Sequence, residues 1–170
     1  MWQRLPDTGG LKSMNKIEDA FKNKKAFIPF VTAGDPSLDV TRELILAMQE
    51  AGADLIEIGI PFSDPVAEGP VIQEADDRAL SAGVTTDKIF DMVDDIADKI
   101  HVPIVFMTYI NPIYVYGVEK FAKRAKACGA AGVIVPDVPF EEKEEIRGSF
   151  EAEGLVVISM VAPTSADRVR

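Results

Sequence analysis

The chain has 170 residues, 47% of them hydrophobic, and a formal net charge of −10. This length and apolar content fit one globular domain and exclude a disordered or fibrous chain. The negative charge leaves no basic surface for a nucleic acid, and no apolar run reaches the roughly 18 residues of a membrane span. We therefore expect a cytoplasmic protein that binds neither nucleic acid nor membrane. With one cysteine and one histidine, neither a disulfide within the chain nor a Cys/His zinc site is possible.

Five short runs rich in Ile, Val and Phe are predicted to be β-strands. They are residues 26–32, 55–60, 103–109, 131–135 and 155–161. Several of these runs are apolar almost throughout, which is typical of strands covered on both faces in a parallel sheet.

Segments with helical spacing of apolar residues lie before and between the strands. Their boundaries carry capping signals, with Ser37 and Thr85 as starts and Gly52, Gly129 and Gly154 as stops. The apolar positions fall within residues 14–21, 40–48, 89–100, 121–128 and 146–150. The alternation of strand and helix predicts right-handed βαβ units and a parallel sheet.

A polar loop that contains or adjoins proline follows each predicted strand. In a (β/α)8 barrel the carboxyl ends of the strands form the face that carries the chemistry, so these loops favour an α/β TIM barrel. An open flavodoxin-like sheet is the alternative, and the glycine-rich dinucleotide and P-loop motifs are absent from the sequence. A complete barrel needs about 250 residues. We therefore expect a truncated barrel of five units over residues 14–170, with residues 1–13 as an extension or tag remnant.

Glu57 is the residue of greatest chemical interest, because it lies inside an apolar strand. A glutamate is seldom fully buried unless it is paired or used, and burial raises its pKa. Its ordinary structural role would be to cap a neighbouring strand or helix.

Four segments carry a resemblance to the tryptophan synthase alpha subunit family. They are EIGIPFSDPVAEGPVIQ at 57–73, IPFVTAGDP at 28–36, MTYINP at 107–112 and VPDVP at 135–139. The resemblance implies retro-aldol cleavage of indole-3-glycerol phosphate to indole and glyceraldehyde 3-phosphate. It also implies no cofactor in this chain and a beta-subunit partner that holds pyridoxal phosphate in an alpha2beta2 complex.

The resemblance further implies roles for four residues of the site. Glu57 matches the general acid and base that acts at indole C3 and at the glycerol hydroxyl. Glu68 falls where the family usually has an aspartate facing the indole N–H, so its side chain is longer by one methylene. Phe30 and Tyr109 match positions that line the indole pocket. From the residues alone, Glu68 would be a solvated loop glutamate, and Phe30 and Tyr109 would be core aromatics.

At the partner interface, the resemblance implies roles for Asp64, Asn111 and Pro112. Without it, Asp64 reads as a turn aspartate before proline. Asp137 ends the fourth strand, and a role as partner to the start of the turn that follows it is equally compatible with the sequence.

Two other functions are compatible with parts of the sequence. One is an inactive fragment or self-associating half-barrel module, because the family's phosphate-binding loops follow strands six to eight and the fifth strand would leave an open edge. The other is a related barrel enzyme with a lysine-centred site, such as indole-glycerol-phosphate synthase. No lysine lies in the five predicted strands, which counts against that enzyme.

Overall fold

The computed structural model describes residues 16–22, 24–139 and 141–164. Five parallel strands form one sheet in the order β1-β2-β3-β4-β5. They are β1 (Phe30–Thr32), β2 (Ile56–Gly59), β3 (Ile104–Met107), β4 (Gly132–Ile134) and β5 (Val156–Ile158). All five predicted strands are confirmed, although each is shorter than its apolar run. The predicted extension, residues 1–13, lies outside the described residues.

Each strand lies beside its neighbour in the chain, without reversal of direction or order. A doubly wound sheet would reverse its order at a switch point, whereas a (β/α)8 barrel adds each unit beside the last. The sheet is therefore a five-stranded segment of a barrel, as the sequence predicted.

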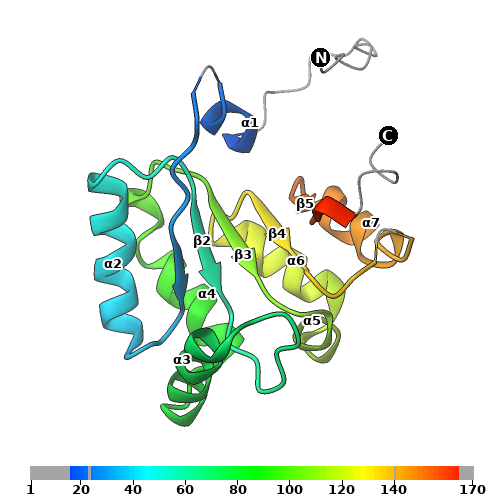
Figure 1. Ribbon diagram of the computed structural model, residues 1–170. Helices are drawn as coiled ribbons and strands as arrows, with labels where there is room; N and C mark the ends of the chain where they lie inside the picture. The colour runs from blue at the N-terminus through cyan, green and yellow to red at the C-terminus, as the bar shows by residue number, and fades with distance from the viewer. Residues whose placement is uncertain (1–15, 23, 140, 165–170) are drawn as a thin grey trace.

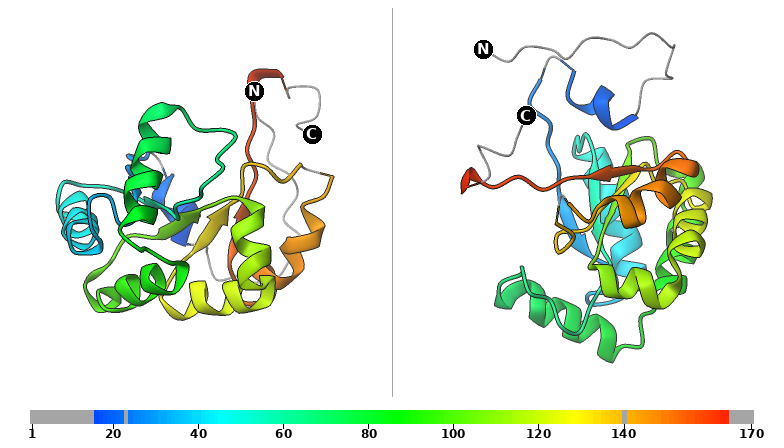
Figure 2. Two further views of the ribbon diagram at one scale, coloured as in Figure 1. Left: turned by 90° about the horizontal axis from the view of Figure 1, so that it is seen from below. Right: turned by 90° about the vertical axis from the view of Figure 1, so that its right-hand side faces the viewer.

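Helices alternate with the strands, and those that follow β1 form an arc along one side of the sheet (Figures 1 and 2). They are α1 (Lys16–Ala20), α2 (Leu38–Glu50), α3 (Pro70–Ser81), α4 (Thr86–Asp94), the short 3-10 helix η1 (Ala97–Lys99), α5 (Ile110–Tyr116), α6 (Val118–Ala127) and α7 (Glu144–Ala152). No helix among the described residues is both long enough and apolar enough to cross a membrane.

The predicted capping signals act as expected. The Ser37 hydroxyl accepts a hydrogen bond from the Val40 N–H at 3.2 Å, and the Thr85 hydroxyl accepts one from the Lys88 N–H at 3.4 Å. Gly52 follows α2 with a φ of +94°, a conformation that favours glycine. The helix predicted over residues 89–100 is shorter, because α4 ends at Asp94 and η1 carries the chain on toward β3.

Two helices, α3 and α5, were not predicted. The buried face of α3 consists of Ala75, Asp76 and Ala79, which give no strong apolar period. The prediction of a loop directly after the third strand is wrong, because residues 110–112 are the first turn of α5. Pro112 is tolerated there because the first turn of a helix does not use its backbone N–H groups in helical hydrogen bonds.

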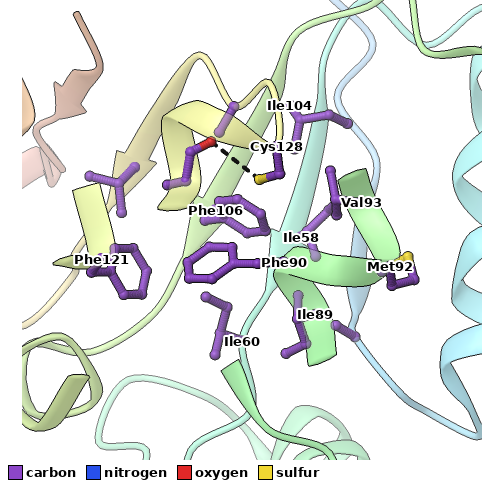
Figure 3. Packing of buried hydrophobic residues seen from close by; sticks show 14 of the residues in the cluster. Ile58, Ile60, Ile89, Phe90, Met92, Val93, Ile104, Phe106, Phe121 and Cys128 are labelled. Carbon is purple, nitrogen blue, oxygen red and sulfur yellow. Dashed lines mark hydrogen bonds between the residues drawn. The ribbon is translucent and has the colours of Figure 1, made fainter. Parts of the chain in front are cut away.

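The main core lies between the sheet and the arc of helices. Phe90 of α4 is fully buried and packs edge to face against Phe106 and Phe121, with ring centroids 5.2 and 5.1 Å away (Figure 3). Cys128 is buried in the same cluster, where its thiol donates to the Ala125 carbonyl at 3.2 Å. The face of the sheet that packs against this core is its outer face.

A smaller cluster covers the opposite, inner face of the sheet. It contains Leu55, Val105 and Ile134 together with Ile17 of α1. Helix α1 lies near the amino ends of the strands, at the far end from α3 and α5 (Figure 1). Toward the carboxyl ends of the strands, other side chains form the inner face of the sheet, and Glu57 is one of them.

Candidate active site

Glu57 lies in the middle of β2, between Phe30 of β1 and Val105 of β3 in the sheet register. Its neighbours Ile56 and Ile58 belong to the main core on the outer face. Because side chains alternate along a strand, the Glu57 side chain belongs to the inner face. Its carboxyl group is half-buried, and this burial raises its pKa above the usual 4.5.

No hydrogen bond or ion pair to the Glu57 carboxyl group is found within residues 16–22, 24–139 and 141–164. A carboxyl group that capped a strand or helix would accept a hydrogen bond from a backbone N–H. Within the described chain, then, Glu57 does not have the capping role that was its structural alternative. Its burial favours the protonated form of the carboxyl group more than water does.

The Phe30 ring lies on the same inner face, directly over Gly59. A Cβ atom on Gly59 would stand 2.6 Å from Cζ of Phe30 and 2.9 Å from its Cε2, closer than van der Waals contact permits. Glycine at position 59 therefore makes room for the ring. Phe30 and Glu57 are partners in the register of β1 and β2, so an aromatic surface lies beside the carboxyl group.

Tyr109 follows β3, and its ring is buried, with only 4% of its surface exposed. Its hydroxyl donates a hydrogen bond to the Glu68 carboxylate and accepts one from the Ala67 N–H at 2.8 Å. Its ring also packs against Phe62, with centroids 5.4 Å apart. Tyr109 is thus more than a core aromatic: it fastens the loop between β2 and α3 to the end of β3.

Glu68 is half-buried rather than a solvated loop residue. Burial raises its pKa, and the charge of Asp137 adds to the effect, while the backbone N–H groups of Glu68 and Ala67 oppose it. The hydrogen bond from Tyr109 also favours the ionised form. The pKa values of Glu57 and Glu68 are both raised, so the two environments do not shift them in opposite directions.

Asp137 lies after β4, at the same end of the sheet. Its carboxylate accepts from the Ile110 N–H, at 3.0 Å for Oδ1 and 3.3 Å for Oδ2. It therefore partners the start of α5, which precedes it in the chain, and not the turn that follows it. A carboxylate at this position also suits the positive end of the helix.

The three residues predicted at the partner interface lie on two neighbouring surface segments. Asp64 is exposed in the loop between β2 and α3, where it accepts from the Ser63 hydroxyl at 2.5 Å. Asn111 is exposed and Pro112 half-buried in the first turn of α5. Both segments lie at the carboxyl end of the sheet (Figure 1).

Asp76 of α3 is a residue near this site that the sequence analysis missed. It is only 7% exposed, and burial raises its pKa to about 6. The nearby Phe62 backbone N–H opposes this rise of the pKa, and the charges of Glu68 and Asp77 add to it. The signal was the helical spacing of Ile72, Ala75, Asp76 and Ala79, which places Asp76 on an inward face.

A cavity of about 1040 Å³ among the described residues lies elsewhere. It opens beside β5, and its lining includes Lys126, Arg147, Glu151 and Val156 but none of the predicted site residues. Along its described length, β5 pairs with β4 on one side alone. The cavity therefore belongs to the edge of the sheet and not to the site around Glu57.

Comparison with known proteins places the chain among relatives of one kind. The family model "Tryptophan synthase alpha chain" matches residues 17–170. The tryptophan synthase alpha chain of Petrotoga mobilis is 48% identical over 158 residues, covering 92% of this chain and 61% of that protein. The corresponding chain of Lacticaseibacillus casei is 46% identical over 156 residues, covering 92% and 59%.

Similar solved structures are also tryptophan synthase alpha chains. The tryptophan synthase alpha chain of Legionella pneumophila is 37% identical, with a TM-score of 0.85 over 92% of this chain and 61% of that one. A chain from the tryptophan synthase a2b2 complex of Pyrococcus furiosus is 41% identical, with a TM-score of 0.80 over 84% and 61%. This chain thus spans about three-fifths of the length of its relatives. It belongs to the tryptophan synthase alpha chain family.

Proposed function

We propose that this chain supplies the acid–base part of a site that cleaves indole-3-glycerol phosphate to indole and glyceraldehyde 3-phosphate. The observation that carries the proposal is Glu57, a half-buried carboxyl group on the inner face of the sheet with a raised pKa and an aromatic ring beside it. The names of the curated relatives, tryptophan synthase alpha chain, agree with a lyase of tryptophan biosynthesis.

The cleavage needs one proton delivered and one removed. The protonated Glu57 carboxyl group gives its proton to C3 of the indole ring, which leaves positive charge on the ring nitrogen. The resulting carboxylate then takes the proton of the hydroxyl on the carbon attached to C3. The carbon–carbon bond breaks, its electron pair returns to the ring, and that carbon becomes the aldehyde. Glu57 ends protonated, so the group is regenerated.

Glu68 stabilises the positive charge that appears on the ring nitrogen. Its carboxylate accepts a hydrogen bond from the indole N–H, and stabilises the cation as C3 is protonated. Tyr109 holds the Glu68 side chain and the adjoining backbone in place, and Phe30 provides an apolar surface for the flat ring. This chemistry uses no cofactor in this chain, and pyridoxal phosphate belongs to the beta subunit.

The partner in this proposal is a tryptophan synthase beta subunit in an alpha2beta2 complex. The Pyrococcus furiosus relative is described as part of an a2b2 complex. Asp64, Asn111 and Pro112, at the carboxyl end of the sheet, are the surface we assign to this contact. Replacing Asp64 by Ala should weaken beta-subunit binding in calorimetry. Replacing Asp98 of η1, which is also exposed but lies before the amino end of β3, should leave beta-subunit binding unchanged.

Release of indole from indole-3-glycerol phosphate tests the reaction, with and without the beta subunit. Glu57→Gln keeps the size of the side chain and removes its acid, so indole release should fall by about 10²-fold or more. Glu50→Gln, on the exposed face of α2, is the matched control and should not change the rate. Equal rates for wild type and Glu57→Gln would contradict the proposal.

A further inference from the structure

The backbone on both sides of Tyr109 is hydrogen-bonded to β4 and to the segment that follows it. The Thr108 N–H donates to the Ile134 carbonyl of β4 at 3.1 Å. The Ile110 N–H donates to the Asp137 carboxylate, at 3.0 Å for Oδ1 and 3.3 Å for Oδ2. Because the backbone conformation limits the directions that a side chain can take, these two attachments set the direction of the Tyr109 ring.

Tyr109 occupies the position before α5 where a helix usually has a capping residue. Its backbone there is extended, and its side chain makes no capping bond to the helix. Serine, threonine, aspartate and asparagine are preferred at such positions, because their short side chains accept from the first N–H groups of the helix. The Tyr109 hydroxyl instead accepts from the Ala67 N–H and donates to the Glu68 carboxylate. Asp137 thus supplies from another segment an acceptor for the start of α5, while Tyr109 holds the loop between β2 and α3.

The segment that carries Asp137 is itself attached to the core. Val135 belongs to the main core, and Val138 packs against it. The Val138 N–H donates to the Val135 carbonyl at 3.4 Å, which closes a turn that includes Asp137. The charge of Asp137 also raises the pKa of Glu68, in agreement with their places at the same end of the sheet. Asp137 therefore holds the Ile110 N–H from a position that the core sets.

We propose that Asp137 is a positioning residue for the Glu68 carboxylate. Its own carboxylate fixes the Ile110 N–H and thereby the direction of Tyr109, whose hydroxyl holds Glu68. The inference rests on the proposed function for its effect on rate, whereas the effect on the position of the loop does not depend on the reaction.

Amide hydrogen exchange on the intact protein tests the effect on the loop. In Asp137→Ala the Ile110 amide should exchange faster, and the Ala67 amide, which reports on the Tyr109 hydroxyl, should follow. The Glu57 amide, bonded to the Pro29 carbonyl at 2.9 Å in the sheet, should stay protected. If Ile110 loses protection and Ala67 keeps it, Asp137 serves only the start of α5 and the proposal is wrong.

Kinetics with indole-3-glycerol phosphate test the effect on rate. Asp137→Ala should lower kcat by about 10- to 100-fold, since displacement of a catalytic group by about 1 Å costs this much, while KM changes little. Asp137→Asn keeps an oxygen acceptor for the Ile110 N–H and should keep kcat near the wild-type value. Unchanged kcat in Asp137→Ala, or an Asp137→Asn variant as slow as Asp137→Ala, would overturn the positioning role.

Thr85→Ala is the matched control, because it removes an acceptor from the start of a different helix. The Thr85 hydroxyl accepts from the Lys88 N–H at 3.4 Å at the start of α4. This variant should match wild type both in kcat and in the protection of the Ala67 amide. Equal losses of kcat in Thr85→Ala and Asp137→Ala would mean that any weakened helix start slows the reaction, against the proposal.

A double variant tests whether Asp137 acts through Tyr109. Tyr109→Phe already releases Glu68, so adding Asp137→Ala to it should lower kcat little further. If the two losses multiply, the residues act independently and the positioning role is wrong. If Asp137→Ala does not fold, Asp137→Leu, of similar size and without an acceptor, takes its place in all these measurements.

The outcomes separate this inference from the proposed function. Loss of protection at Ile110 and Ala67 in Asp137→Ala, with no indole release even from wild type, would contradict the reaction and support the positioning role. Indole release that depends on Glu57 but is the same in Asp137→Ala as in wild type would support the reaction and overturn the positioning role.

Discussion

The Tyr109 hydroxyl joins the Glu68 carboxylate to the end of β3 and also receives the Ala67 N–H at 2.8 Å. Tyr109 and Glu68 are 41 positions apart in the chain. Their hydrogen bond attaches the loop between β2 and α3 to the end of β3. A loop glutamate thereby acquires a fixed position. Removing the hydroxyl while keeping the ring isolates this contribution.

Tyr109→Phe should lower the free energy of unfolding by about 1–2 kcal/mol, because the Ala67 N–H loses its acceptor in a part-buried hydrogen bond and Glu68 loses its donor. It should also lower kcat, since Glu68 is no longer held. Urea unfolding and indole release measure the two effects. Tyr114→Phe is the control: its hydroxyl donates to Glu145 at 2.7 Å on the surface, and its loss should cost less than about 0.5 kcal/mol. Equal losses from both variants would contradict the role of Tyr109.

Glu68→Asp should reduce activity, although the resemblance implies that aspartate is usual at this position. The loop of this chain places a glutamate carboxylate at the Tyr109 hydroxyl, and shortening the side chain by one methylene withdraws it. We expect kcat to fall by up to about 10²-fold. A Glu68→Asp variant as fast as wild type would mean that the loop backbone adjusts to either length. Glu74→Asp, at an exposed position of α3, controls for the substitution itself.

Asp76 gives stability a defined pH dependence. Its pKa is raised from 3.8 to about 6 on folding, so the folded state binds more protons than the unfolded state between these values. Its contribution is therefore fully present below about pH 4 and is lost as the pH rises through about 6. The loss amounts to at most about 3 kcal/mol, from about 1.4 kcal/mol per unit.

The comparison of Asp76→Asn with wild type measures this pH-dependent contribution to the free energy of unfolding. Asparagine does not titrate, so the stability of the variant relative to wild type should increase from pH 4 to pH 7.5 in urea unfolding. Asp77→Asn, exposed on the same helix, should show no such trend. A constant difference between Asp76→Asn and wild type over this range would contradict the burial of a titrating carboxyl group.

Phe90 tests the packing that supports the sheet. It is fully buried among Phe106, Phe121 and Tyr116, so Phe90→Ala leaves a cavity and should cost about 3–5 kcal/mol. Phe27→Ala, with 55% of the side chain exposed, should cost less than about 1 kcal/mol. Equal costs in thermal or urea unfolding would mean that the core does not depend on this aromatic cluster.

The sequence predicted those parts of the fold that have strong apolar patterns. The five strands and helices α2, α4, α6 and α7 carry such patterns or end at glycine, and all are present. Helix α3 was missed because alanine and aspartate form its buried face, and α5 because Pro112 in its first turn resembled a loop signal.

The site was predictable where it depends on strand position and not where it depends on contacts between loops. Glu57 and Phe30 follow from their places on neighbouring strands. The pairing of Asp137 with the start of α5, and of Glu68 with Tyr109, joins segments whose relative placement no local pattern encodes. Only the folded sheet brings these groups together.

The central claim is that Glu57 is the acid and base of the reaction, and a carbon-13 NMR titration of its carboxyl group tests it most directly. We expect a pKa above 4.5 that coincides with the pKa governing kcat/KM for indole release, and loss of both in Glu57→Gln. A Glu57 pKa at or below 4.5, or a pH profile unchanged in Glu57→Gln, would contradict the account.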